Sequence, residues 1–117
     1  MYDLPKGFSF EFLRDRELEL LRYGPYTVTL HFTGGIQLQI EGSFTHNANG
    51  QRAKPAHFPL SESRLMLLLM QRVTEVEAKR NGTLTLRFGN GDTLMIDGNV
   101  GPYESYNVNH PDGLLVV

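Results

Sequence analysis

Hydrophobic and polar residues alternate along two stretches of this chain, residues 26–44 and 82–100, in the same order. At a constant offset of 56 positions, eight of the nineteen aligned residues are identical, whereas unrelated segments share about one. The alternating apolar residues are Val28, Leu30, Phe32, Leu38 and Ile40 in the first stretch and Leu84, Leu86, Phe88, Leu94 and Ile96 in the second. This period of two predicts two antiparallel hairpins that each bury one face.

Turn residues and upstream strands extend the pattern. Gly34-Gly35 divides the first stretch and Asn90-Gly91 the second, as expected of tight hairpin turns. A further candidate strand precedes each hairpin, at residues 18–23 and 73–80, which makes Leu20 and Val76 equivalent. We therefore predict an internal repeat, residues 18–44 and 74–100, of two three-stranded meanders that pair as two related units or continue one sheet.

The insert between the repeats, residues 45–72, has a different pattern. Six consecutive apolar residues occupy positions 65–70, and Ser61 precedes them as a candidate N-cap. We predict a helix over residues 62–71. Because this segment lacks a polar face, the helix is expected to be buried on most sides. A buried strand is the alternative that the pattern leaves open. Residues 45–59 are polar and rich in Asn, Gly and Pro, which predicts a long loop, either functional or disordered.

The two ends of the chain complete the expected architecture. Residues 103–109 and 114–117 predict a terminal hairpin around Pro111-Asp112-Gly113. Phe8, Phe10 and Phe12 fit both an edge strand and a helix, and the pattern does not decide between them. The predicted fold is a single domain, residues 1–117, of the α+β class: mainly antiparallel β, with two repeated meanders, one helix and a C-terminal hairpin.

Composition narrows the classes of function. The 117 residues contain no cysteine, which excludes a disulfide framework, a thiolate zinc site and a cysteine nucleophile. Eleven Lys and Arg against thirteen Asp and Glu give a net charge of −2 with interspersed signs, so a nucleic acid or an anionic membrane is not the expected partner. The chain starts without a leader-like pattern, and its six-residue apolar run is shorter than the ~20 residues of a spanning helix, which predicts a soluble, cytoplasmic protein.

The densest polar and aromatic cluster follows the second repeat. Tyr103, Glu104, Ser105, Tyr106 and Asn107 are consecutive, and in a strand Glu104 and Tyr106 share one face. A carboxylate beside a phenol can act as an acid or base if burial raises its pKa. The structural alternative is that the glutamate pairs locally and the tyrosines pack at the boundary of the core. Tyr103, Glu104 and Tyr106 are therefore the candidate binding residues.

The remaining chemistry-bearing residues form no specific constellation. His31, His46, His57 and His110 are scattered, and an eleven-residue separation of the middle two, without a placed third ligand, does not specify a metal site. Ser105, His110 and Asp112 supply the residue types of a hydrolase triad but occupy one short hairpin without a nucleophile elbow. No catalytic residue, metal or cofactor is predicted.

The segments GPYTVTLHFTGGIQLQIEGSF, NGTLTLRFGNGDTLMI, YESYNV and PDGLLVV together resemble a family of small bacterial proteins of unknown function. In that family, Tyr-Glu-Ser or Tyr-Glu-Ala followed by an aromatic residue comes after the second hairpin, and Tyr103, Glu104 and Tyr106 match this motif. The resemblance covers residues 10–117. It implies a β-rich domain with one helix and no assigned activity; proteins of this size and style also resemble immunity or accessory proteins encoded near bacterial toxins.

Two functions from different classes follow. The first is a non-enzymatic interaction module that binds a protein partner or itself through the acidic and aromatic surface at residues 103–106. The alternative is a small-ligand-binding β-barrel, or an enzyme, whose pocket uses Glu104, Tyr106 and one histidine. A filled interior favours the first, and a pocket of several hundred Å³ with converging polar groups favours the second.

Overall fold

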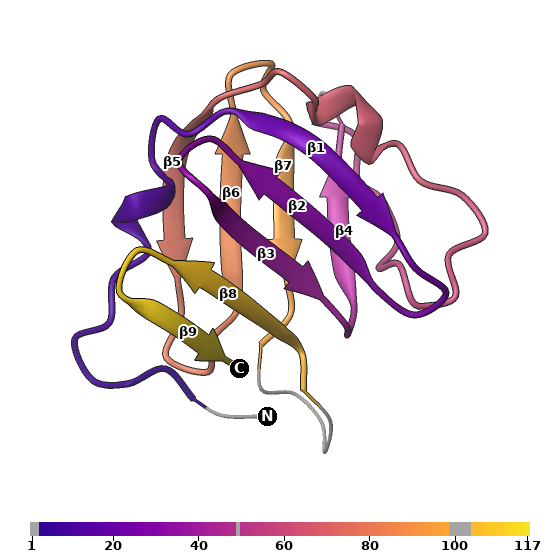
Figure 1. Cartoon of the computed structure of the whole chain (residues 1–117). Coiled ribbons are helices and arrows are strands. Elements are labelled where there is room, and N and C mark those ends of the chain that lie inside the picture. The colour runs from indigo at the N-terminus through magenta and orange to yellow at the C-terminus, as the bar shows by residue number, and fades with distance from the viewer. Residues whose placement is uncertain (1–2, 49, 99–103) are drawn as a thin grey trace.

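In this computed structural model, which describes residues 3–48, 50–98 and 104–117, the chain forms two antiparallel sheets packed as layers (Figure 1). The first sheet has the strand order β1-β2-β3-β8-β9: β1 (Leu18–Tyr23), β2 (Val28–Phe32), β3 (Ile36–Ile40), β8 (Tyr106–His110) and β9 (Gly113–Val116). The second has the order β4-β7-β6-β5: β4 (Phe44–Asn47), β7 (Thr93–Ile96), β6 (Leu84–Phe88) and β5 (Val73–Ala78). Strands of one sheet cross those of the other obliquely.

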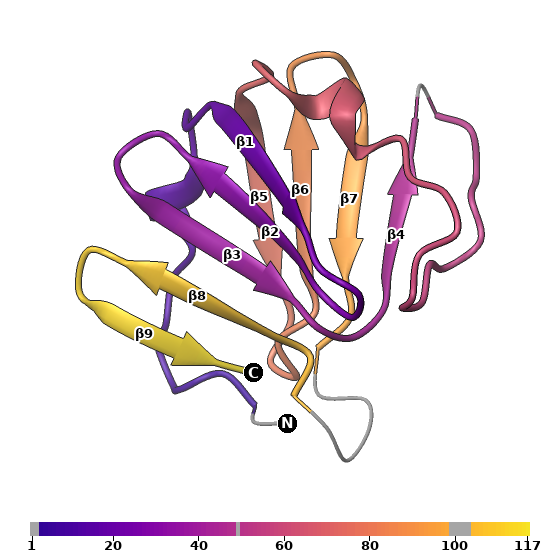
Figure 2. The ribbon, with the colours of Figure 1, turned by 45° about the vertical axis from the view of Figure 1, so that its right-hand side comes forward.

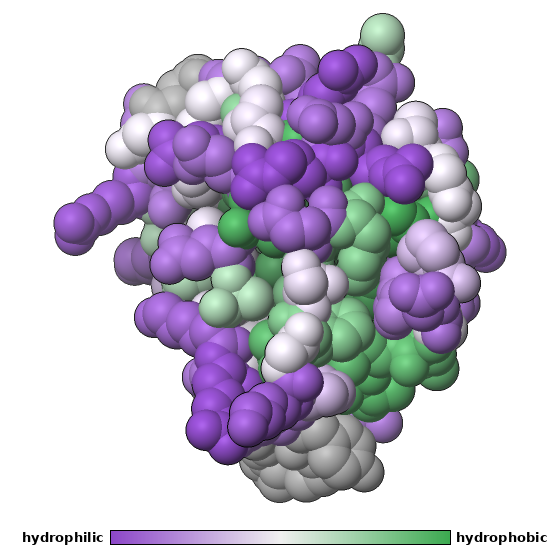
Figure 3. Space-filling view, turned by 90° about the vertical axis from the view of Figure 1, so that its left-hand side faces the viewer, coloured by the Kyte–Doolittle hydropathy of each residue, from purple (hydrophilic) through white to green (hydrophobic). Residues whose placement is uncertain are grey.

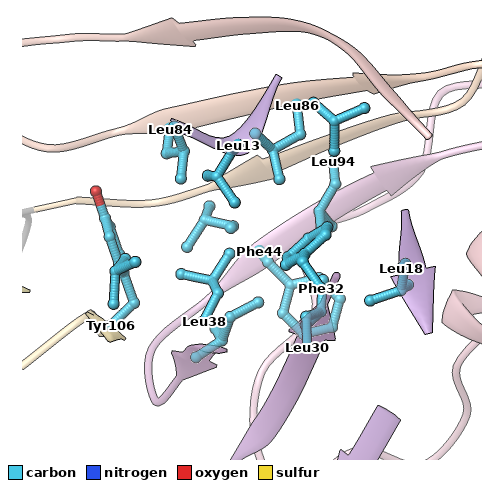
Figure 4. Packing of buried hydrophobic residues seen from close by; sticks show 14 of the residues in the cluster. Leu13, Leu18, Leu30, Phe32, Leu38, Phe44, Leu84, Leu86, Leu94 and Tyr106 are labelled. Carbon is cyan, nitrogen blue, oxygen red and sulfur yellow. The ribbon is translucent and has the colours of Figure 1, made fainter. Parts of the chain in front are cut away.

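The core lies between the sheets and consists of the alternating apolar residues. All ten predicted inward positions, five in each stretch, are at most 1% exposed, which confirms that part of the prediction. Figure 4 shows residues such as Leu30 and Leu38 from one sheet facing Leu86 and Leu94 from the other. Burying each such side chain contributes about 1.5–3 kcal/mol, and a slip of one residue in register would turn the set to water.

The strands β1–β3 and β5–β7 are each a three-stranded antiparallel meander, and they lie in different sheets. The expected equivalence of Leu20 and Val76 is wrong, because the connection between the first two strands of the meander is one residue longer in the second meander, at residues 79–83, than in the first, at residues 24–27. Leu21 pairs with Leu30, and Val76 pairs with Leu86, so Leu20 turns to the outer face. The inward pattern of β1 and β5 therefore cannot be read by strict alternation.

The predicted helix over residues 62–71 is absent, and the fold class is all-β rather than α+β. The described residues contain only two short 3₁₀ helices, η1 (Glu11–Leu13) and η2 (Leu65–Leu68). The N–H of Met70 donates to the carbonyl of Leu18 at 2.7 Å, and the N–H of Leu18 donates to the carbonyl of Gln71 at 3.0 Å. Since these backbone groups pair with β1, they are not free to continue an α-helix.

The N-terminal phenylalanines lie on neither a strand nor an α-helix. Phe8 and Phe10 belong to an irregular segment, and Phe12 lies in η1. The ring of Phe12 stacks on His110 with centroids 4.9 Å apart, and Phe10 is buried in the core. Figure 3 views this side of the molecule, where apolar surface lies between hydrophilic side chains. The segment thus closes one end of the two layers by aromatic packing.

Within the part of the chain that the structure describes, no helix has the length and apolar character that crossing a bilayer requires.

Candidate functional site

The predicted binding residues separate in the structure. Tyr103 lies outside the described residues. Glu104 is exposed, and its carboxyl interacts with Glu41, the residue that follows β3. Burial raises the pKa of Glu41 above its ordinary 4.5; the like charge of Glu104 and a hydrogen bond between the two carboxyls raise it further, and the Gln39 amide opposes them. The two carboxyls therefore repel each other when both are ionised, and the contact disfavours the charged form of Glu41.

Tyr106 is a core residue. Its side chain is fully buried between the sheets (Figure 4). Its hydroxyl donates a hydrogen bond to the carbonyl of Gly82 in the turn before β6. Burial raises the pKa of the phenol well above its ordinary 10.0. The hydroxyl therefore links β8 of the first sheet to the second sheet, and it is not presented to a ligand.

An open cleft of about 700 Å³ lies elsewhere, and residues of β4 and of the segment 51–65 line it. Figure 2 shows the chain after β4 folding back beside this strand. The segment is anchored where Phe44 and Ala56 exchange two backbone hydrogen bonds, of 3.2 and 2.7 Å, and where the N–H of Ala53 donates to Asn47 Oδ1 at 2.9 Å. Tyr23 Oη lies 3.0 Å from Ser63 Oγ and so ties the far wall to β1. Of the interval 45–59, predicted to be one loop, residues 45–47 belong to β4, and residues 51–57 line the cleft.

His46 lies at the floor of the cleft, next to a buried aspartate. Its Nε2 is 2.9 Å from Asp92 Oδ2, and the two side chains are only 8% and 2% exposed. The turn between β6 and β7 fixes Asp92: its N–H donates to Asn90 Oδ1, and its carbonyl accepts from Phe88. A buried carboxylate of this kind fixes the orientation of the imidazole.

Sequence reasoning missed this pair. His46 falls within the predicted loop, and Asp92, which follows the predicted turn at Asn90-Gly91, is given no functional role. The signal that could have found His46 is that Phe44, His46 and Ala48 alternate with polar residues, which continues the first repeat as a strand and turns the histidine toward the core side. The contact with Asp92 depends on the pairing of β4 with β7, which the sequence does not specify.

The remaining candidates do not form a catalytic arrangement. Ser105 Oγ donates to the buried carbonyl of Gly98, and His110 stacks on Phe12 and accepts a weak hydrogen bond of 3.4 Å from the Asp112 N–H. Among the described residues, no group of three His, Cys, Asp or Glu side chains is placed to hold a metal.

A second surface surrounds η2 and is apolar. Met66, Leu67, Leu69 and Met70 are exposed, whereas Leu65 and Leu68 are buried. The prediction that this run would be buried on most sides is thus wrong for four of its six residues. We call these four residues the η2 surface. The neighbouring edge strand β1 adds two further exposed apolar side chains, Leu20 and Tyr23.

The model of a family of unknown function, DUF6188, matches residues 11–117. The chain belongs to DUF6188. The matched range covers every strand described above, so the two sheets, the cleft and the η2 surface all lie within the DUF6188 domain. No curated protein and no solved structure matches the chain. The family assignment carries no activity, and the function has to be argued from these surfaces.

Proposed function

We propose that this protein is a non-enzymatic interaction module that binds a partner protein through the η2 surface. The observation that carries the proposal is the exposure of four large apolar side chains around η2, of which Met66 is 63% exposed and Met70 is 76% exposed. Contiguous apolar surface on a folded domain marks an interaction site, because leaving it in water forgoes the free energy of burial.

The backbone at Met70 supports the same conclusion. Met70 has a φ of 68°, in the left-handed region that glycine or asparagine adopts more readily. Its side chain adds little to the core, since three-quarters of it is exposed. Neither the backbone conformation nor packing in the core favours methionine at this position. Residues that do not suit their local structure often occur at functional sites.

The chemistry of the surface suits a protein partner. Methionine side chains are unbranched and polarisable, so they adapt to irregular apolar surfaces. Leucines beside them supply area that a partner can desolvate. The edge of β1 next to η2 pairs with no further strand from Glu19 to Tyr23 among the described residues, which leaves backbone groups available at the border of the site.

The alternative pocket that uses Glu104 and Tyr106 has less support. Tyr106 is occupied by its hydrogen bond inside a filled core, and the cleft is lined by other residues. Glu104 is the described member of the predicted trio that a partner can reach.

The experiment is a selection of displayed random peptides on the immobilised chain, followed by titration of the enriched peptides in solution. We expect peptides rich in aromatic and aliphatic residues. Leu67→Ser should weaken their binding by about tenfold or more, because burial of a leucine contributes about 1.5–3 kcal/mol.

Leu114→Ser is the matched control, since Leu114 is a similarly exposed leucine on β9 in the other part of the first sheet. It should leave the dissociation constant unchanged within about twofold, a difference of about 0.4 kcal/mol. Sedimentation of both variants tests whether a second copy of the chain is the partner. Equal losses for the two variants, or peptides that bind with unchanged affinity to Leu67→Ser, would remove the η2 surface from the proposal.

A further inference from the structure

We infer that the cleft beside β4 is a second, separate binding site, for a small organic anion with an apolar body. The site is distinct from the η2 surface, although the segment that ends in η2 forms one of its walls. The cleft volume of about 700 Å³ falls within the range of sites for small ligands.

The charge on the walls selects the sign of the ligand. Arg52, Lys54 and Arg64 line the cleft, and Glu62 is the carboxylate that lines it with them. None of the three cations forms an ion pair with another described residue. This local excess of positive charge occurs in a chain whose net charge is −2. An anion in the cleft would therefore find cationic donors that no internal carboxylate occupies.

The apolar part of the lining selects the body of the ligand. Phe44 and Leu65 provide buried apolar walls, and Leu60 and Ala56 extend them toward the solvent. A hydrated inorganic ion would leave these walls unused, whereas a ring or short aliphatic group would cover them. The combination of a cationic rim and an apolar wall thus fits an amphipathic anion such as an aryl phosphate or an aryl carboxylate.

His46 provides an oriented polar group at the floor. Asp92 holds the imidazole through Nε2, and His46 is one of the residues that line the cleft. The buried carboxylate of Asp92 opposes an anion next to the imidazole, whereas Arg52, Lys54 and Arg64 attract it. The cationic side chains at the rim are consequently the groups that make the first contact with the ligand.

The test uses three probes against the full chain with ¹⁵N-detected NMR titration: phenyl phosphate, inorganic phosphate, and benzyl alcohol as the neutral analogue. We expect saturable shifts at the amides of His46, Ala53 and Ala56 with phenyl phosphate. Its affinity should exceed that of either other probe, and added salt should weaken phenyl phosphate but not benzyl alcohol.

The triple variant Arg52→Gln, Lys54→Gln, Arg64→Gln should weaken phenyl phosphate by about tenfold, since exposed ion pairs contribute at most about 1 kcal/mol each. The control makes the same charge change at cations outside the cleft lining: Lys6→Gln, Lys79→Gln and Arg80→Gln. It should leave the affinity within about twofold. Equal losses in the two triple variants, shifts confined to other parts of the sheets, or equal affinity for phenyl phosphate and benzyl alcohol would overturn the inference.

Discussion

Replacement of Tyr106 by phenylalanine removes one hydroxyl from the centre of the molecule and leaves the ring in place. The hydroxyl donates to the carbonyl of Gly82, which joins the two sheets. The net contribution of such a hydrogen bond is about 1 kcal/mol, and the buried carbonyl left without its donor adds a penalty, for a total of about 1–3 kcal/mol. Because the ring stays, no large cavity opens. Urea denaturation of both proteins, followed by circular dichroism, measures this difference directly.

The pH dependence gives a second, independent signature. Burial holds the pKa of Tyr106 above its unfolded value of 10.0, so the folded state resists ionisation of the phenol. The contribution of Tyr106 to stability is fully present below pH 10 and is lost as pH rises above it toward the folded pKa. The stability difference between the wild-type protein and Tyr106→Phe should therefore be constant near neutral pH and shrink by roughly pH 11.

Two results would refute this account of Tyr106. One is a loss below about 0.5 kcal/mol at neutral pH, which would mean that the hydroxyl has no buried partner. The other is a stability difference that does not change at high pH. A variant that keeps its stability but loses the binding of a partner would instead support the functional interpretation of this tyrosine.

Two further predictions concern the core and the acidic pair. Phe88→Ala should destabilise the fold by about 3–5 kcal/mol, whereas Thr85→Ala, on the outer face of the same strand, should cost less than about 1 kcal/mol. Denaturation curves of the two variants measure these losses. Equal losses would contradict a strand with a single buried face. Glu41→Gln should stabilise the fold near neutral pH, because burial and Glu104 disfavour the ionised form of Glu41 in the folded state and so raise its pKa. The gain in stability should vanish below the ordinary glutamate pKa of 4.5, where the carboxyl is protonated in both states. A gain that persists in thermal melts at low pH would contradict this prediction.

The β architecture could be predicted from the sequence because its signal is local. Alternation of period two fixes which face of β2 and β6 is buried, and glycine at the turns fixes where the chain reverses. The C-terminal hairpin is confirmed for the same reason, with Pro111 and Asp112 between β8 and β9. These features require no knowledge of which strands from distant parts of the chain become neighbours.

The errors occur where long-range pairing decides the local conformation. The apolar run at residues 65–70 resembles a buried helix, but its last backbone groups pair with Leu18, so it ends after one 3₁₀ turn and exposes most of its side chains. The bulges in β1 and β5 shift the alternation by one residue. The contact between His46 and Asp92 joins positions 46 residues apart, and no local pattern indicates it.

The measurement that tests the proposed function most directly is a paired determination of stability and partner affinity for Met70→Gly. Glycine suits the left-handed backbone at this position, so the free energy of unfolding should stay unchanged or rise by up to about 1 kcal/mol. The same substitution removes the most exposed side chain of the η2 surface, and we expect the affinity for the selected peptides to fall by about tenfold. Unchanged affinity in a protein of unchanged stability would contradict the proposal that this surface binds the partner.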